Sequence, residues 1–172
     1  PDPDAEYEKE FVLNVDDMPF VVAKPHQFGN VVPVDESAGV KIDQAQIGSC
    51  ANGRYEDIEI AARMLKGRKV AKGVRFLISP SSQQVYLQCL KDGLITQLIE
   101  SGAQVVTPGC GLCQPKVGYL AAGEVCITAT TRNFKGRKGS IKAEIYLGGP
   151  LTVTAAAVAG EIVNPREVFG EI

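Results

Sequence analysis

Strand-like and helix-like segments alternate along most of this chain. The apolar, strand-like segments are residues 45–50, 74–80, 103–109, 124–131 and 143–149, and helical periodicity covers 52–67, 81–102 and 150–163. The segment 52–67 carries apolar residues at i, i+3, i+4 and i+7 and is expected to end at Gly67, while Gly93 is expected to divide 81–102 into two helices. Because strands separated by helices favour βαβ units, the chain is predicted to be an α/β protein with a mostly parallel sheet.

The N-terminal part has a different character. Residues 10–15 and 19–25 are predicted to be short strands or extended segments, and 26–39 a connecting loop. The chain starts at Pro1 without a methionine, so we expect a processed product or a piece of a longer protein. With 172 residues, 45% of them hydrophobic, one domain or one domain with a small extension is expected.

Charge and hydropathy narrow the range of partners. The net charge of -2 provides no large field for nucleic acid or an anionic membrane, so neither partner is expected. The apolar runs are too short to span a membrane, and the N-terminus is acidic where a signal peptide would be basic. A soluble cytoplasmic protein is expected. Five cysteines without an export signal favour thiols that bind metal, act in catalysis or lie in the core.

Three polar, glycine-rich motifs each follow a strand-like segment: IGSCANGRYED (47–57), TPGCGLCQP (107–115) and TTRNFKGRKG (130–139). Ligand sites in parallel sheets gather where strands end, so these turns are the candidate site. Gly48 and Gly53 indicate a close approach of the backbone to a bulky group. By contrast, Cys89 lies in a helical pattern and Cys126 in an apolar strand, and both are expected in the core.

The cysteines of the turns leave several chemistries open. Cys-Gly-Leu-Cys alone fits a thioredoxin-like dithiol, a zinc site, iron–sulfur ligation or a turn that contains thiols by chance. Cys50 adds a third thiol, whereas a closed zinc site takes four ligands, and His26 is the one histidine that could complete it. Three cysteines on a [4Fe–4S] cluster would leave one iron free to act as a Lewis acid on a hydroxyl or water.

The third motif carries Arg132 and Arg137, whose guanidinium groups bind carboxylates in a bidentate manner. Near an open iron they predict a site for a hydroxylated di- or tricarboxylate. The alternative is that both arginines are solvated at the surface beside Lys135 and Lys138.

The segments IGSCANGRYEDI, PGCGLC and TRNFKGR, in this order, resemble the three cluster and substrate motifs of the aconitase superfamily. Within it they most resemble the large subunits of the 3-isopropylmalate dehydratases and homoaconitases, and KIDQAQIGSC and YLGGPLTVTAAAVAGEI extend the similarity. The resemblance implies a three-layer α/β/α domain, the third domain of such a large subunit.

The resemblance also implies roles for residues. Cys50, Cys110 and Cys113 would ligate the [4Fe–4S] cluster, and Arg132 and Arg137 would contact substrate carboxylates. Three further residues, Ser49, Asn52 and Thr131, would lie beside the cluster. Residues 1–172 would form one iron–sulfur domain, with 1–43 as a lead-in and 44–172 as the core that binds cluster and substrate.

The implied activity is that of a hydro-lyase that isomerises a hydroxy acid by dehydration and rehydration, with 3-isopropylmalate in leucine biosynthesis as the first candidate. Homoaconitase, aconitase and 2,3-dimethylmalate dehydratase are alternatives within the family, and a dithiol protein or a non-catalytic metal-binding domain outside it. Thr131 stands where the family commonly has asparagine. The family's preceding domains and its small subunit, which carry the catalytic acid and base, are expected as partners, so this chain alone is expected to be inactive.

Overall fold

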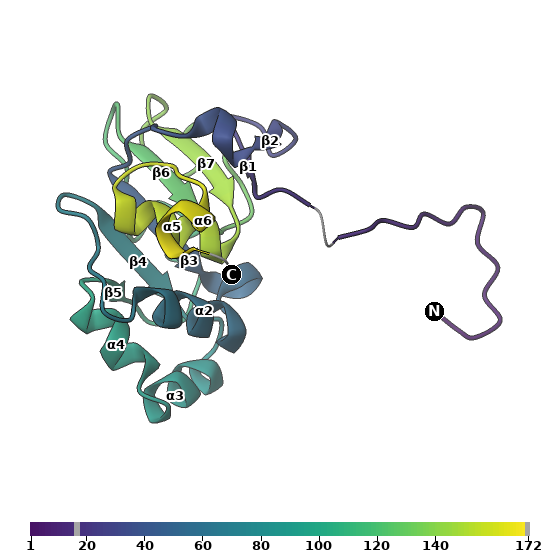
Figure 1. Ribbon diagram of the computed structural model, residues 1–172, viewed down its shortest axis with the longest axis horizontal. Helices are drawn as coiled ribbons and strands as arrows, with labels where there is room; N and C mark the ends of the chain where they lie inside the picture. The colour runs from purple at the N-terminus through teal and green to yellow at the C-terminus, as the bar shows by residue number, and fades with distance from the viewer. Residues whose placement is uncertain (16–17, 171–172) are drawn as a thin grey trace.

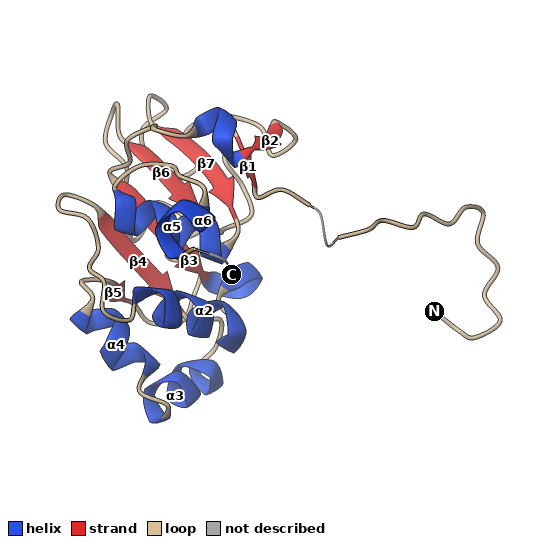
Figure 2. Ribbon diagram, in the orientation of Figure 1, coloured by secondary structure: helices blue, strands red, loops and turns tan. Residues whose placement is uncertain are grey.

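The computed structural model describes residues 1–15 and 18–170. The described residues form one mixed sheet of seven strands in the order β2-β1-β7-β6-β3-β4-β5 (Figures 1 and 2). The strands are β1 (Val21–Ala23), β2 (Val31–Pro33), β3 (Gln44–Gly48), β4 (Arg75–Ser79), β5 (Gln104–Val105), β6 (Val125–Thr128) and β7 (Glu144–Gly148). The helices are α1 (Ser49–Asn52), α2 (Tyr55–Leu65), α3 (Gln83–Lys91), α4 (Leu94–Glu100), α5 (Pro150–Ala159) and α6 (Pro165–Phe169), with a 3-10 helix, η1 (Val34–Ser37).

The five strands from β7 to β5 pair in parallel, and β1 pairs antiparallel with both β7 and β2. The predicted α/β fold with a mostly parallel sheet is therefore confirmed. Strand β3 occupies the middle of the parallel part, between β4 and β6, so the strand that leads into the first motif is covered on both edges. The predicted division of 81–102 at Gly93 is also confirmed, because Gly93 adopts a left-handed conformation between α3 and α4.

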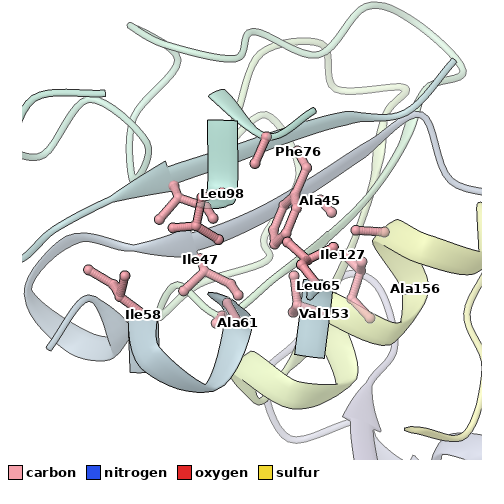
Figure 3. Packing of buried hydrophobic residues seen from close by; sticks show 14 of the residues in the cluster. Ala45, Ile47, Ile58, Ala61, Leu65, Phe76, Leu98, Ile127, Val153 and Ala156 are labelled. Carbon is pink, nitrogen blue, oxygen red and sulfur yellow. The ribbon is translucent and has the colours of Figure 1, made fainter. Parts of the chain in front are cut away.

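The main core lies between the sheet and its helices (Figure 3). Helix α2 buries Ile58, Ala61, Ala62 and Leu65, the residues that helical periodicity selects, and α5 packs beside it. Strand β3 contributes Ala45 and Ile47 to this core, while the alternate residues Gln44 and Gln46 face the opposite side of the sheet.

The opposite side of the sheet is covered mainly by loops. A small apolar cluster there joins Leu120 and Ala143, from two loops, to Cys126 of β6 and Ile145 of β7. The two loops belong to the segments 106–124 and 129–143, which contain the second and third motifs. The layer that carries two of the motifs thus packs against polar side chains of β3 instead of against the main apolar core.

The N-terminal part differs in places from its prediction. Residues 10–15 are exposed and form neither helix nor strand, and in Figure 1 the N-terminal segment runs away from the body of the protein. The predicted loop over 26–39 contains β2 and η1, because Val31–Pro33 pairs with β1 at the edge of the sheet. Strands β1 and β2 therefore extend the sheet at one edge, and η1 follows β2. No helix among the described residues is long and apolar enough to cross a membrane.

Candidate functional site

The three motifs follow the carboxyl ends of β3, β5 and β6. Since these strands run parallel within one sheet, their carboxyl ends lie along the same edge. The turns around residues 50, 110 and 132 therefore lie on one side of the fold, although they are far apart in the sequence.

The first turn has an unusual backbone. Gly48 has φ +129° and Ser49 has φ +58°, the one positive φ of a non-glycine residue within the described chain. Such conformations cost free energy and are concentrated at functional sites. A Cβ atom on Gly48 would lie 2.1 Å from the carbonyl oxygen of Ser79, and one on Gly53 would lie 2.5 Å from it. The close neighbour of both glycines is therefore the backbone at the end of β4.

The buried Ser49 joins the first motif to the second. Its Oγ atom lies 2.8 Å from the Sγ atom of Cys113, 64 residues later in the chain. The amide of Cys113 donates to the carbonyl oxygen of Cys110 at 3.1 Å, which closes the Cys-Gly-Leu-Cys turn. Cys113 is 7% exposed, whereas Cys50 and Cys110 are exposed, and all the cysteines are free.

These three cysteines are a suitable donor set for an iron–sulfur cluster, because they place three thiols on two turns that touch. The predicted grouping of the three thiols around one cluster is not seen in the part of the chain that the structure describes. Cys113 is seated beside the residue that precedes Cys50, but in the described residues no three His, Cys, Asp or Glu side chains are arranged to hold a metal ion.

Asn52 joins the first motif to the third. Its Nδ2 atom donates to the carbonyl oxygen of Ala129 at 2.5 Å, at the end of β6 and directly before the third motif. The following Thr131 and Arg132 are exposed, and an Arg132 Nη1 atom donates to the Thr131 carbonyl oxygen at 2.7 Å. Asn52 and Thr131 are thus brought to the same end of the sheet as Ser49.

Arg132 lines a cavity of about 450 Å³ together with Phe28, Phe134 and His26. Its guanidinium carbon lies 6.0 Å from the ring centre of Phe28, and that of Arg137 lies 5.5 Å from the ring of Phe134. Asn133 is buried and donates to backbone carbonyls of the loop before β2, which fixes this turn against residues 24–27. The cavity thus combines a guanidinium group with two aromatic rings, but neither Arg137 nor a cysteine lines it, so the expected common cavity of both arginines and the three thiols is not found among the described residues.

His26 belongs to this cavity, and its buried Nδ1 atom has no hydrogen-bond partner among the described residues.

The two cysteines predicted to lie in the core are confirmed there, since Cys89 and Cys126 are both 0% exposed. Burial raises the pKa of each thiol to about 11, which keeps both protonated at neutral pH.

Sequence reasoning missed Lys138, which it grouped with surface lysines. Its side chain is buried, and its Nζ atom donates to Oε1 of Gln46 and to the carbonyl oxygen of Leu112. Nothing in the local pattern GRKG distinguishes this lysine from the exposed Lys135. The available signal was the pair of polar residues inside β3. Gln44 and Gln46 are fully buried, and buried polar side chains need hydrogen-bond partners such as a buried lysine.

Comparison with known proteins identifies the family of the chain. The model of the aconitase family (aconitate hydratase) matches residues 36–160. The chain is 52% identical over 167 residues to the 3-isopropylmalate dehydratase large subunit 2 of Archaeoglobus fulgidus. It is 49% identical to the large subunit 1 of Methanopyrus kandleri and 48% identical to the large subunit of Desulfitobacterium hafniense.

Each of these alignments covers at least 96% of this chain but 40% of the relative, so the chain spans about 40% of the length of the relatives it matches. The family match begins at η1 and ends just after α5 and so includes all three motifs. The chain belongs to the aconitase family.

Proposed function

We propose that this chain is the cluster- and substrate-binding part of a hydro-lyase large subunit that isomerises a hydroxy di- or tricarboxylate, with 3-isopropylmalate as the substrate. The observation that carries the proposal is the 2.8 Å contact between Ser49 and Cys113, which joins two cysteine motifs across 64 residues. A local dithiol, as in a thioredoxin-like protein, does not require that contact.

In this proposal Cys50, Cys110 and Cys113 hold a [4Fe–4S] cluster, and Ser49, Asn52 and Thr131 adjoin it. When bound through three cysteines, such a cluster supplies an open Lewis-acidic iron for a hydroxyl group. Arg132 and Arg137 bind the substrate carboxylates and orient the substrate, since a guanidinium group forms two parallel hydrogen bonds with a carboxylate.

Proton transfer requires an acid and a base that this chain does not provide in the proposal. They come from preceding domains of the large subunit and from a small subunit. General acid–base catalysis contributes about 100- to 10,000-fold to a rate, so the isolated chain should have no measurable hydro-lyase activity. In the proposal residues 1–172 act as one domain, in which 44–172 supply the cysteines and arginines, and the lead-in 1–43 adds Phe28 to the cavity beside Arg132.

The cavity beside Arg132 favours an alkyl-bearing substrate. Phe28 and Phe134 offer aromatic surface next to the guanidinium group, which suits an acid that carries an apolar substituent beside a carboxylate. Citrate and homocitrate carry a third carboxylate on a side chain. In 3-isopropylmalate an apolar isopropyl group takes the place of that charged side chain.

Two experiments test this function. Anaerobic incubation of the chain with iron(II) and sulfide should produce the broad visible absorption of iron–sulfide charge transfer, and a Cys50→Ala variant should lose it. In the full-length parent with its small subunit, kcat/KM should be higher for 3-isopropylmalate than for homocitrate, citrate or 2,3-dimethylmalate. Absence of the visible band from the wild-type chain refutes the cluster site.

The arginine role is tested in the same full-length enzyme by Arg132→Lys. This change keeps the charge but loses the bidentate geometry, which should lower kcat/KM about 10- to 100-fold, the equivalent of one hydrogen bond to a charged group. Arg166→Lys is the matched control, because Arg166 also lies over an aromatic ring, that of Phe20, and is not part of any of the three motifs. Equal effects of the two changes would return Arg132 to the role of a surface residue.

A further inference from the structure

Lys138 is the one charged side chain that is buried among the described residues, at 1% exposure. An ammonium group removed from water is costly unless its donors find acceptors. The Nζ atom of Lys138 has two acceptors, Oε1 of Gln46 and the carbonyl oxygen of Leu112. Burial of this lysine is therefore compensated by specific contacts.

Both contacts lead to the cysteine motifs. Leu112 lies inside the turn between Cys110 and Cys113, and Gln46 lies on β3 two residues before Gly48. The backbone carbonyl of Lys138 also accepts from the amide of Leu120 at 2.8 Å. Lys138, at the end of the third motif, thus connects that motif to the second motif and to the strand that precedes the first.

The surroundings of Lys138 lack an obvious counter-ion. The charges and titratable groups that act on its ammonium are the thiols of Cys126 and Cys113 and the guanidinium of Arg137, and no described ion pair includes it. Desolvation lowers the pKa of Lys138 to about 8. A cluster bound by three thiolates carries negative charge, and the net charge around a cluster sets its reduction potential.

We propose that Lys138 is a positioning residue that holds the Cys110–Cys113 turn against β3 and places a buried positive charge beside this turn, which in the proposed function would hold the cluster. The part concerning the turn stands on the contacts to Gln46 and Leu112. The part concerning the charge rests on the proposed function, because it requires the cluster. The two parts are tested separately.

The turn is tested in the metal-free chain by amide hydrogen exchange. Three backbone hydrogen bonds report on it: the amides of Cys113 and Gln114 donate to Cys110, and that of Val117 donates to Gly111. Lys138→Met keeps the length of the side chain and removes both its donors and its charge. These three amides should then exchange about 10- to 100-fold faster, while amides of the β3 and β4 ladder remain unchanged.

Lys135→Met is the matched control, because Lys135 is exposed and lies three residues earlier in the same turn. It should leave exchange at all these amides unchanged. Unchanged exchange of the three turn amides in folded Lys138→Met overturns the positioning role. If Lys138→Met fails to fold, the same measurement is made on Gln46→Met, which removes the acceptor on β3 that Lys138 uses, and wild-type exchange of the three turn amides there also overturns the positioning role.

The charge is tested in the chain reconstituted anaerobically with iron(II) and sulfide. Lys138→Met should release iron to a chelator about 10- to 100-fold faster than wild type. Both Met and Gln at this position are neutral, so both variants should lower the midpoint potential of the cluster, because the reduced cluster loses a stabilising positive charge. A role limited to packing would leave the potential of Lys138→Gln at the wild-type value, and this result overturns the charge assignment.

The outcomes separate this inference from the proposed function. A wild-type chain that takes up no cluster overturns the proposed function and the charge role together. The exchange experiment needs no metal, so its result still decides whether Lys138 holds the turn.

Discussion

Replacement of Gly48 by alanine should destabilise the protein strongly, because two separate costs fall on one residue. Its φ of +129° is unfavourable for a residue with a side chain, and its added Cβ would lie 2.1 Å from the backbone oxygen of Ser79. The region around φ +129° and ψ −152° is adopted essentially by glycine alone and costs other residues about 1–3 kcal/mol, and overpacking of a tight site costs about 1–3 kcal/mol. The sum predicts a loss of about 2–6 kcal/mol in the free energy of unfolding.

Two other glycines separate these costs. Gly67 has φ +74° with nothing within 4 Å of an added Cβ, so Gly67→Ala carries the conformational cost alone, about 1–2 kcal/mol. Gly53 has φ −123°, and its added Cβ would lie 2.5 Å from the same Ser79 oxygen, so Gly53→Ala carries the packing cost alone, about 1–3 kcal/mol.

Urea denaturation of the metal-free variants, followed by circular dichroism, measures all three. For a domain of this size the loss at Gly48 corresponds to a fall in Tm of about 4–24 °C. The reasoning is refuted if Gly48→Ala costs no more than Gly67→Ala. It would then follow that β3 and β4 separate easily at this point, and that the glycine is needed for something other than contact with β4.

Three further predictions concern charge, thiols and metal. Glu124→Gln removes the bidentate ion pair with Arg75 (2.8 and 2.9 Å) and should cost about 1 kcal/mol at pH 7. Because Arg75 lowers the pKa of the Glu124 carboxyl, this stability is present above the ordinary pKa of about 4.5 and is lost as the pH falls through the folded-state pKa, so wild type and variant should converge in acid denaturation curves. Brief treatment of the native chain with iodoacetamide at pH 8 should label the exposed Cys50 and Cys110. It should not label Cys126, whose buried thiol has a pKa of about 11. Labelling of Cys126 at a similar rate, measured by mass spectrometry, would contradict its place in the core. A chelator should leave the Tm of the aerobically purified chain nearly unchanged, because the core is formed by apolar residues of the sheet and helices, and a large fall would instead indicate a metal that stabilises the fold.

The regular elements of the core were accessible from the sequence, because their patterns are local. The spacing of Ile58, Ala61 and Leu65 identifies the buried side of α2 without knowledge of its partners. The strand β2 escaped prediction because three residues that end in Pro33 carry too short a pattern, and their pairing with β1 is a tertiary contact. The helix α6 was not predicted, although Asn164 and Pro165 form a helix start signal. Its five residues make fewer than two turns, too few to show helical periodicity.

The arrival of the three motifs at one edge of the sheet was predictable from the sequence, but the packing of their side chains was not. Strand ends place the three motifs at one edge of a parallel sheet, and that inference requires only the order of the elements. Which side chains touch depends on how loops of the second layer fold over β3. The contacts of Ser49 with Cys113 and of Lys138 with Leu112 join positions 64 and 26 residues apart, and no local pattern encodes them.

The central place of β3 has a consequence for the order of folding. Gln44 pairs with Arg75 on one side and with Cys126, 82 residues later, on the other. During synthesis the edge of β3 toward β6 stays unpaired until residues 125–128 have emerged, and the helix α5 that covers β3 comes later still. Long-range parallel pairing is slow to form because the entropy of closing the loop is lost before the contacts are gained. The thiol of Cys50 is therefore synthesised early, and a nascent chain contains this thiol long before it has formed the sheet against which the turn with Cys50 packs.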